Sequence, residues 1–74
     1  MAEKLKVFPN PVKDKLNIDT NDDKEYFFQI YNMSGQLVKE GRFDNKQTDV
    51  SNLSTGIYLL RINNSESVIK IIKQ

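Results

Sequence analysis

Oxygen-bearing side chains gather at residues 19–23, which read Asp-Thr-Asn-Asp-Asp. Carboxylate and amide oxygens at alternate positions are ligands that calcium prefers, so this segment is a candidate cation site. It lacks the glycine and the distal glutamate of a calcium-binding helical loop. We therefore interpret it as a solvated polar turn between two strands, assign no metal ligand, and keep calcium binding as the alternative.

Catalytic chemistry has few candidate residues in this chain. The sequence contains no histidine and no cysteine, so the usual general base, the commonest transition-metal ligand and the best nucleophile are all missing. A serine or threonine nucleophile would need a lysine or carboxylate partner in a pocket, and 74 residues leave little interior for one. We therefore expect no enzyme, no catalytic residue and no cofactor.

The aromatic residues are a second candidate site, as a platform on which sugars could stack. Alternation along strands buries at least half of such a set, so core packing explains most of them. The set consists of Tyr26, Phe27, Phe28, Tyr31, Phe43 and Tyr58.

The charges are balanced, with 11 basic and 10 acidic side chains and a net charge of +1. A nucleic-acid partner would require a basic stripe, and none is present. No apolar run approaches the roughly 18 residues of a membrane span, so we expect no direct membrane insertion. Lys70 and Lys73 are interpreted as protection of a strand edge against pairing, with a recognition mark as the alternative.

The sequence consists of short segments in which apolar and polar residues alternate, separated by turn residues. This pattern predicts an all-β protein. The expected fold is a small immunoglobulin-like antiparallel β-sandwich of about seven short strands. We expect one domain over residues 5–74, preceded by residues 1–4 as an N-terminal tail or a remnant of excision from a longer protein. The expected strands are residues 5–8, 15–20, 25–33, 36–42, 47–50, 57–63 and 67–73.

Residues 25–33 have the pattern of a central strand, because large apolar side chains lie on both of its faces. Phe28 and Ile30 share one face, and Phe27, Tyr31 and Met33 share the other. We expect the second face to be covered by a neighbour, by a turn, or by the remainder of a parent protein.

The last two strands have faces that period-two alternation assigns. In residues 57–63 we expect Arg61 to face water and Tyr58, Leu60 and Ile62 to face the core. Residues 67–73 are ambiguous, since isoleucines lie on both faces, and Ile71 with its face-mate Ile69 is the favoured inward pair.

The turns also have recognisable residues. The run Pro9-Asn10-Pro11 cannot continue a ladder, so it predicts a bend near a sheet edge or end, with Val12 packing at the bend. Residues 32–35 have asparagine first and glycine fourth, which favours a type I turn with a glycine bulge and a hairpin. Residues 44–46 are expected to form the next turn.

Residues 49–62 predict the corner that organises the sandwich. Leu53 is an isolated apolar residue among turn formers, and Gly56 offers a positive φ. Tyr58 at the strand entry resembles the tyrosine of a β-sandwich corner, whose ring joins the core while its hydroxyl returns to upstream backbone.

Taken in order, fragments from about Val7 to Gln74 resemble the type A C-terminal sorting domain of the type IX secretion system. They are Phe8-Pro9-Asn10-Pro11, Leu16, Ile18, Ile30-Tyr31-Asn32, Gly35, Val38, Asp49-Val50-Ser51, Leu53, Gly56-Ile57-Tyr58 and Lys70-Ile71-Ile72. Phe8 stands where tyrosine is more usual and Asn32 where aspartate is, and both keep the same physical role. The recognition or structural signature is assigned to Pro9, Asn10, Pro11, Gly35, Asp49, Leu53, Gly56, Tyr58, Lys70, Ile71 and Ile72.

The resemblance implies a domain carried by a secreted cargo protein of a Bacteroidetes-type bacterium. It implies that the N-terminal cargo folds in the periplasm and then passes the type IX translocon of the outer membrane because this domain is recognised. A sortase-like cysteine peptidase would remove the domain at or just before residues 3–7, and the cargo would be joined to surface lipopolysaccharide or released. The final location would be secreted or at the cell surface.

The fold also suggests how recognition would work. Exposed strand edges and a short final strand favour strand addition or docking of the last hairpin, with residues 70–74 read by the receptor. The alternatives are a terminal adhesion or carbohydrate-binding module with the same fold, and a structural spacer of the fibronectin type.

Overall fold

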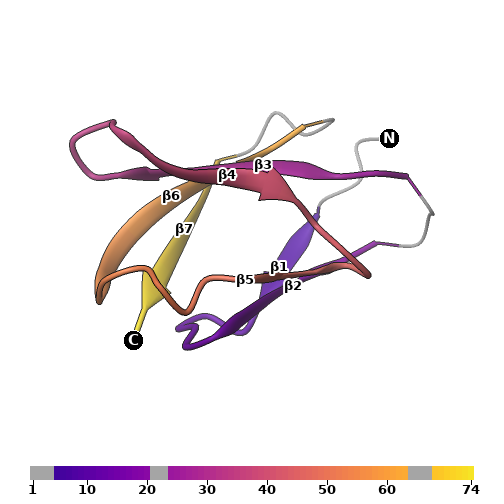
Figure 1. Cartoon of the computed structure of the whole chain (residues 1–74), viewed down its shortest axis with the longest axis horizontal. Helices are drawn as coiled ribbons and strands as arrows, with labels where there is room; N and C mark the ends of the chain where they lie inside the picture. The colour runs from indigo at the N-terminus through magenta and orange to yellow at the C-terminus, as the bar shows by residue number, and fades with distance from the viewer. Residues whose placement is uncertain (1–4, 21–23, 64–67) are drawn as a thin grey trace.

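The computed structural model describes residues 5–20, 24–63 and 68–74, which form seven strands in two antiparallel sheets (Figure 1). One sheet has the order β1-β2-β5 and the other the order β4-β3-β6-β7. The two lie as layers around the core, which confirms the predicted all-β sandwich. The strands are β1 (Lys6–Phe8), β2 (Lys15–Asp19), β3 (Phe27–Asn32), β4 (Leu37–Arg42), β5 (Gln47–Asp49), β6 (Gly56–Ile62) and β7 (Val68–Lys73).

The core lies between the sheets because alternate residues of each strand point inward. Strand β2 buries Leu16 and Ile18, and β3 buries Phe28 and Ile30, as their alternation predicts. Among the described residues, no helix is long or apolar enough to cross a membrane. The buried cluster is Val12, Leu16, Ile18, Tyr26, Phe28, Ile30, Phe43, Val50, Tyr58, Leu60, Ile62 and Ile71.

The last two strands have the predicted faces. Tyr58, Leu60 and Ile62 are buried while Arg61 is exposed. In β7, Ile71 is fully buried and Ile69 packs against the core, so the favoured inward pair is confirmed.

The second face of β3 is exposed in this chain. The strand is central, between β4 and β6, as expected. Phe27 is 47% exposed and Met33 64% exposed, so neither a neighbouring strand nor a turn among the described residues covers this face. The third expected cover, the remainder of a parent protein, stays a prediction.

The hairpin between β3 and β4 has the predicted turn. The carbonyl of Asn32 accepts a 3.0 Å hydrogen bond from the Gly35 N–H, and Gly35 has a φ of 86°. The Asn32 side chain adds two bonds, from the backbone N–H groups of Ser34 and Gln36, each 3.0 Å long. The Asn32 N–H donates a 2.9 Å bond to the Gln36 carbonyl, so Gly35 and Gln36 both lie opposite Asn32, as the glycine bulge predicts. A separate register shift, between Ile30 and Tyr31, leaves Val38 without a cross-strand partner on β3.

The turn before β5 is a tight hairpin. Asp44 and Gln47 exchange backbone hydrogen bonds of 2.8 and 3.1 Å across Asn45 and Lys46. Both central residues are left-handed, with φ of 53° and 61°, which is the type I′ geometry. The sequence predicted the turn, but not that a lysine would occupy a position where glycine is usual.

Candidate functional site

The Pro9-Asn10-Pro11 bend lies against the outer edge of β7. The Nδ2 group of Asn10 donates a 2.9 Å hydrogen bond to the Lys70 carbonyl, and its Oδ1 accepts a 2.9 Å bond from the Ile72 N–H. A primary amide carries the same donor and acceptor as a peptide group. The Asn10 side chain therefore occupies the place of a neighbouring strand.

Val12 extends the same contact toward the end of the chain. Its N–H donates to the Ile72 carbonyl at 2.8 Å, and its carbonyl accepts from the Gln74 N–H at 2.8 Å. Val12 and Lys73 form a parallel bridge. Asn10 and Val12 already use the outward-facing backbone groups of β7 from the Lys70 carbonyl onward, so strand addition at this part of the edge would have to displace them. Strand addition at other edges and docking of the last hairpin stay predictions.

The two prolines fit this edge position. Pro9 and Pro11 both follow cis peptide bonds, and neither has an N–H to donate. The bend thus offers fewer donors to solvent than an ordinary strand would. The predicted location near a sheet edge is confirmed, whereas the contact made by Asn10 was missed.

The predicted corner is present at the entry to β6. The Tyr58 hydroxyl donates a 2.7 Å hydrogen bond to the carbonyl of Ser54, four residues upstream, and the Tyr58 ring is buried. Leu53 packs against the core and donates its N–H to the carbonyl of Val50 at 3.0 Å. Both features that define the corner are confirmed.

Asp49 holds the start of the corner. Its Oδ1 accepts a 2.8 Å hydrogen bond from the Ser51 N–H, and its Oδ2 lies 3.3 Å from the Lys15 Nζ. Hydrogen bonds from the Ser51 hydroxyl and N–H, and then the neighbouring Lys15, lower the pKa of Asp49 to about 2. The carboxylate is exposed, so this shift marks a turn-forming contact and not a buried acid.

The two signature glycines both have a positive φ. Gly35 has a φ of 86°, deep in the region that favours glycine. Gly56 has a φ of 159°, positive as predicted, and a Cβ placed there would meet only Tyr58 Cε2 at 4.0 Å. Both glycines therefore hold backbone conformations that residues with a side chain rarely adopt.

Three pairings gather the signature at one end of the sandwich, the end that carries the C-terminus (Figure 1). Asn32, which opens the Gly35 turn, is the cross-strand partner of Tyr58. Gly56 is the partner of Lys73, and Asn10 bonds to the backbone of Ile72. Within β7, Lys70 and Ile72 are exposed while Ile71 is buried. Residues that are spread along the sequence therefore lie at one end of the sandwich, some of them exposed and others, such as Tyr58 and Ile71, buried.

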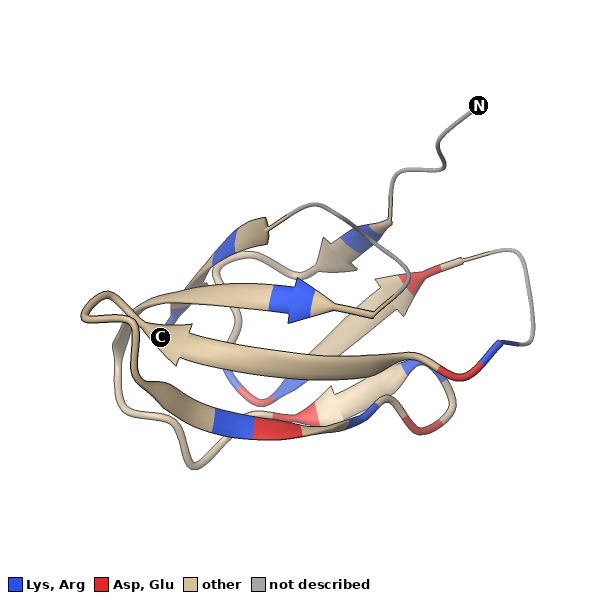
Figure 2. Cartoon of the chain, turned by 90° about the horizontal axis from the view of Figure 1, so that it is seen from above, with Lys and Arg blue, Asp and Glu red and all other residues tan. Residues whose placement is uncertain are grey.

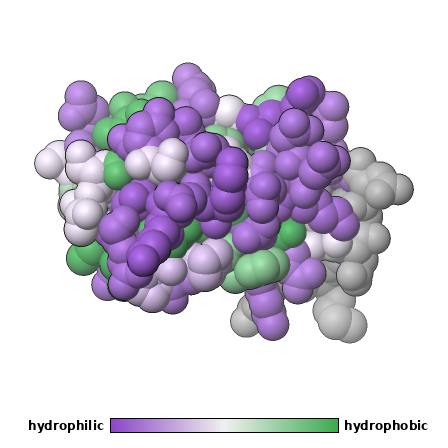
Figure 3. Space-filling view, turned by 60° about the horizontal axis from the view of Figure 1, so that its bottom comes forward, coloured by the Kyte–Doolittle hydropathy of each residue, from purple (hydrophilic) through white to green (hydrophobic). Residues whose placement is uncertain are grey.

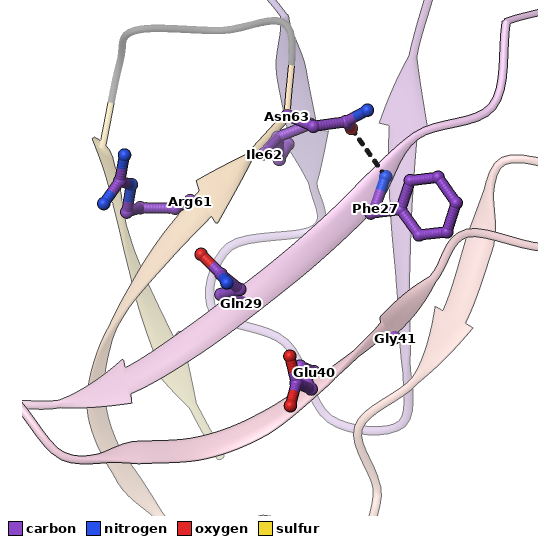
Figure 4. Close-up of a pocket in the computed structure, with 7 residues that line it drawn as sticks. All are labelled: Phe27, Gln29, Glu40, Gly41, Arg61, Ile62 and Asn63. Atoms are coloured by element: carbon purple, nitrogen blue, oxygen red, sulfur yellow. Dashed lines mark hydrogen bonds between the residues drawn. The ribbon is translucent and has the colours of Figure 1, made fainter.

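A shallow hollow lies at the other end of the four-stranded sheet, on its outer face (Figure 4). Its volume is about 390 Å³. The Phe27 N–H donates a 2.6 Å bond to Asn63 Oδ1, which ties β3 to the end of β6. The hollow presents a ring, an amide, a carboxylate and a guanidinium, with no hydroxyl or thiol that could act as a nucleophile. The lining residues are Phe27, Gln29, Glu40, Gly41, Arg61, Ile62 and Asn63.

The aromatic platform is reduced to two rings. Tyr26, Phe28, Phe43 and Tyr58 are buried in the core, as core packing predicts for most of the set. Phe27 is exposed and Tyr31 half-buried, on the outer face of β3.

The candidate cation segment is only partly visible, because residues 21–23 lie outside the described residues. Within residues 5–20, 24–63 and 68–74, no group of three acidic, histidine or cysteine side chains is placed to hold a metal ion.

The described residues thus form a small antiparallel sandwich with a tyrosine corner. The family described as the secretion system C-terminal sorting domain matches residues 6–74. The chain belongs to this family, the C-terminal sorting domains of type IX secretion.

One relative illustrates how such a domain is carried. The chain is 39% identical over 61 residues to Beta-agarase D of Zobellia galactanivorans. The match covers 82% of this chain but only 12% of that protein. The chain therefore corresponds to a small part of its relative.

Proposed function

We propose that the chain directs a parent cargo protein through the outer membrane by way of the type IX translocon, which recognises the folded sandwich. The observation that carries this proposal is the family match over residues 6–74, which spans all seven strands. The cargo lies on the N-terminal side of β1, crosses the periplasm, and ends secreted or at the cell surface.

After translocation, removal of the domain and attachment or release of the cargo would be carried out by a separate enzyme. A sortase-like cysteine peptidase removes the domain, and the cargo is joined to surface lipopolysaccharide or released. The pairing of β1 with β2 restricts where the scissile bond lies. Lys6 pairs with Asp19 and Val7 with Ile18, so cleavage inside β1 would remove a paired strand. Cleavage before Lys6 leaves the sandwich whole.

The signature residues support presentation of this domain and carry no chemistry. The bonds of Asn10 fix the N-terminal bend to β7, and Tyr58 with Leu53 fixes the corner. Both hold the C-terminal end of the sandwich in one geometry. We infer that the receptor reads this end.

The test is export of a reporter fused before residue 5 in a bacterium with type IX secretion. The fusion should appear in the medium or at the surface, and it should remain inside a strain that lacks the translocon. Equal retention of the fusion and of the unfused reporter in the wild-type strain would contradict the proposal. Binding of glycans by the isolated domain, without export, would favour the adhesion module instead.

Deletion of residues 70–74 is a poor test of recognition, although the sequence suggests it. Ile71 is fully buried, and the Ile72 backbone bonds to Asn10 and Val12. The deletion would remove core and hydrogen bonds together, so lost export would report unfolding. Substitutions of exposed β7 side chains separate the two effects.

A further inference from the structure

The outer faces of the two sheets differ in character. The outer face of the three-stranded sheet carries mostly polar cross-strand pairs, and the molecule is largely hydrophilic when viewed from that side (Figure 3). Two of these pairs join opposite charges, and the Lys15 Nζ lies 3.3 Å from the Asp49 carboxylate. The register pairs on this face are Lys6 with Asp19, Phe8 with Asn17, Asn17 with Gln47, and Lys15 with Asp49.

The outer face of the four-stranded sheet is apolar at its centre. Strand β3 carries no charge, and β6 carries one, Arg61 near the end of the strand (Figure 2). The cross-strand pairs Tyr31 with Leu37, Tyr31 with Leu59, and Ile57 with Ile72 make its apolar side chains contiguous. We call this set the outer apolar patch, and it consists of Tyr31, Leu37, Ile57, Leu59 and Ile72.

The patch is open to solvent. Leu37 is 41% exposed, Ile57 42% and Ile72 39%. Their neighbours in the same strands, such as Tyr58 and Ile71, already fill the core from the other face. Contiguous exposed apolar surface on a small domain marks an interaction site, because a partner that covers it removes apolar area from water and so gains free energy of binding.

Lys70 adds a charge to the patch. It lies directly opposite Leu59 and two residues before Ile72 on the same face of β7. In the described part of the chain the ion pairs are Lys15 with Asp49 and Arg42 with Glu25, so no described carboxylate neutralises Lys70. A partner surface that is apolar and carries a carboxylate opposite Lys70 is complementary to it.

The outer edge of β7, next to the patch, has few free backbone groups with which a partner strand could pair. Asn10 and Val12 occupy the outer edge of β7 from the Lys70 carbonyl onward. A partner that approaches residues 70–74 therefore meets the face of the sheet and not free backbone groups.

We propose that the outer apolar patch together with Lys70 is the docking surface for an apolar, carboxylate-bearing surface on the receptor of the export machinery. This inference rests on the proposed function and names the surface that it uses. Docking covers the apolar side chains and pairs the Lys70 ammonium with the carboxylate.

The test compares charge and apolar variants in the reporter fusion. Lys70→Glu and the double variant Ile57→Ser/Ile72→Ser should each lower the exported fraction about tenfold or more, because they reverse the charge or remove the apolar contact. Lys70→Gln should have a smaller effect than Lys70→Glu. Thermal unfolding of the purified variants checks that the sandwich remains folded.

Matched controls lie away from the patch. Lys13→Glu makes the same charge change at an exposed residue between β1 and β2, and Phe27→Ser removes a side chain that is 47% exposed at the far end of β3. Both controls should be exported like the wild type. If the wild type is exported and the patch variants are exported equally well, the docking surface is wrong while the proposed function stands. If the wild type itself is not exported, the proposed function fails first.

The outer apolar patch could instead be covered by a second copy of the chain or by the cargo domain, and each of these covers predicts its own experimental result. Sedimentation of the wild-type chain as a dimer that Ile57→Ser/Ile72→Ser converts to a monomer would overturn the proposal in favour of a second copy. Slower amide exchange at residues 57–59 in the parent protein than in the isolated chain would overturn it in favour of the cargo domain.

Discussion

The Oδ1 atom of Asn10 lies 2.9 Å from the backbone nitrogen of Ile72, although 62 positions separate the two residues. This bond and its companion to the Lys70 carbonyl join the first bend of the chain to its last strand. The sandwich is thus closed by a side chain that imitates a peptide group.

Asn10→Ala should destabilise the domain by about 1–2 kcal/mol, since it deletes two hydrogen bonds at a solvent-accessible edge. Urea unfolding of the wild type and the variant measures the change. Asn52→Ala, in an exposed turn, is the matched control and should have little effect. Equal stability of the Asn10 variant and the wild type would contradict this prediction. It would mean that water bonds to the freed Lys70 carbonyl and Ile72 N–H as well as the Asn10 amide does.

Tyr58→Phe should lower the free energy of unfolding by about 0.5–1.5 kcal/mol, because the Ser54 carbonyl loses a partly buried donor while the ring stays in the core. Tyr31→Phe serves as the comparison, since its hydroxyl donates to the exposed Gln29 side chain at 3.2 Å. Thermal unfolding of both variants should rank the Tyr58 change as the larger. The reverse ranking would contradict the importance of the corner.

Stability should fall at acid pH through Asp49. Its folded-state pKa of about 2 is below the ordinary 3.8, so its contribution is present above pH 3.8 and is lost as the pH falls through about 2. Asp49→Asn should flatten the stability profile within that window, because an amide does not titrate there. Chemical denaturation between pH 2 and pH 5 measures the profile, and parallel curves for the two proteins would contradict the assignment.

Gly35→Ala should cost about 1 kcal/mol or more, because its φ of 86° is unfavourable for any residue with a Cβ. Nothing lies within 4 Å of the added carbon, so the cost is one of backbone conformation alone. Gly56→Ala should also lower stability, since its φ of 159° is one that residues with a Cβ rarely adopt. Urea unfolding of the wild type and both variants measures the losses, and unchanged midpoints would contradict the argument from backbone conformation.

The strands were predictable because alternation and turn residues are local signals. Leu16, Ile18 and Tyr58 are placed as period two requires, and Asn32 with Gly35 forms the turn that their spacing predicts. Such signals need only a few neighbouring residues to agree.

The features that the sequence did not predict depend on contacts between residues far apart in the chain or on the number of sheets. Asn10 could be assigned to a bend, but its partners on β7 are set by how the sheets close. The apolar pattern of β3 predicts cover on both faces but does not say what provides it, and the described residues form two sheets, which leave Phe27 47% exposed. Lys46 gave no signal for a left-handed φ of 61°, since the hairpin around it imposes that geometry.

The tie between Asn10 and β7 has a consequence for protein synthesis. Ile71 supplies a core side chain and Ile72 the backbone partner of Asn10, so the sandwich is complete only when the last residues are available. A chain truncated before Ile71 lacks both. During synthesis the two sheets therefore cannot close around this side chain until residues 71 and 72 have left the ribosome.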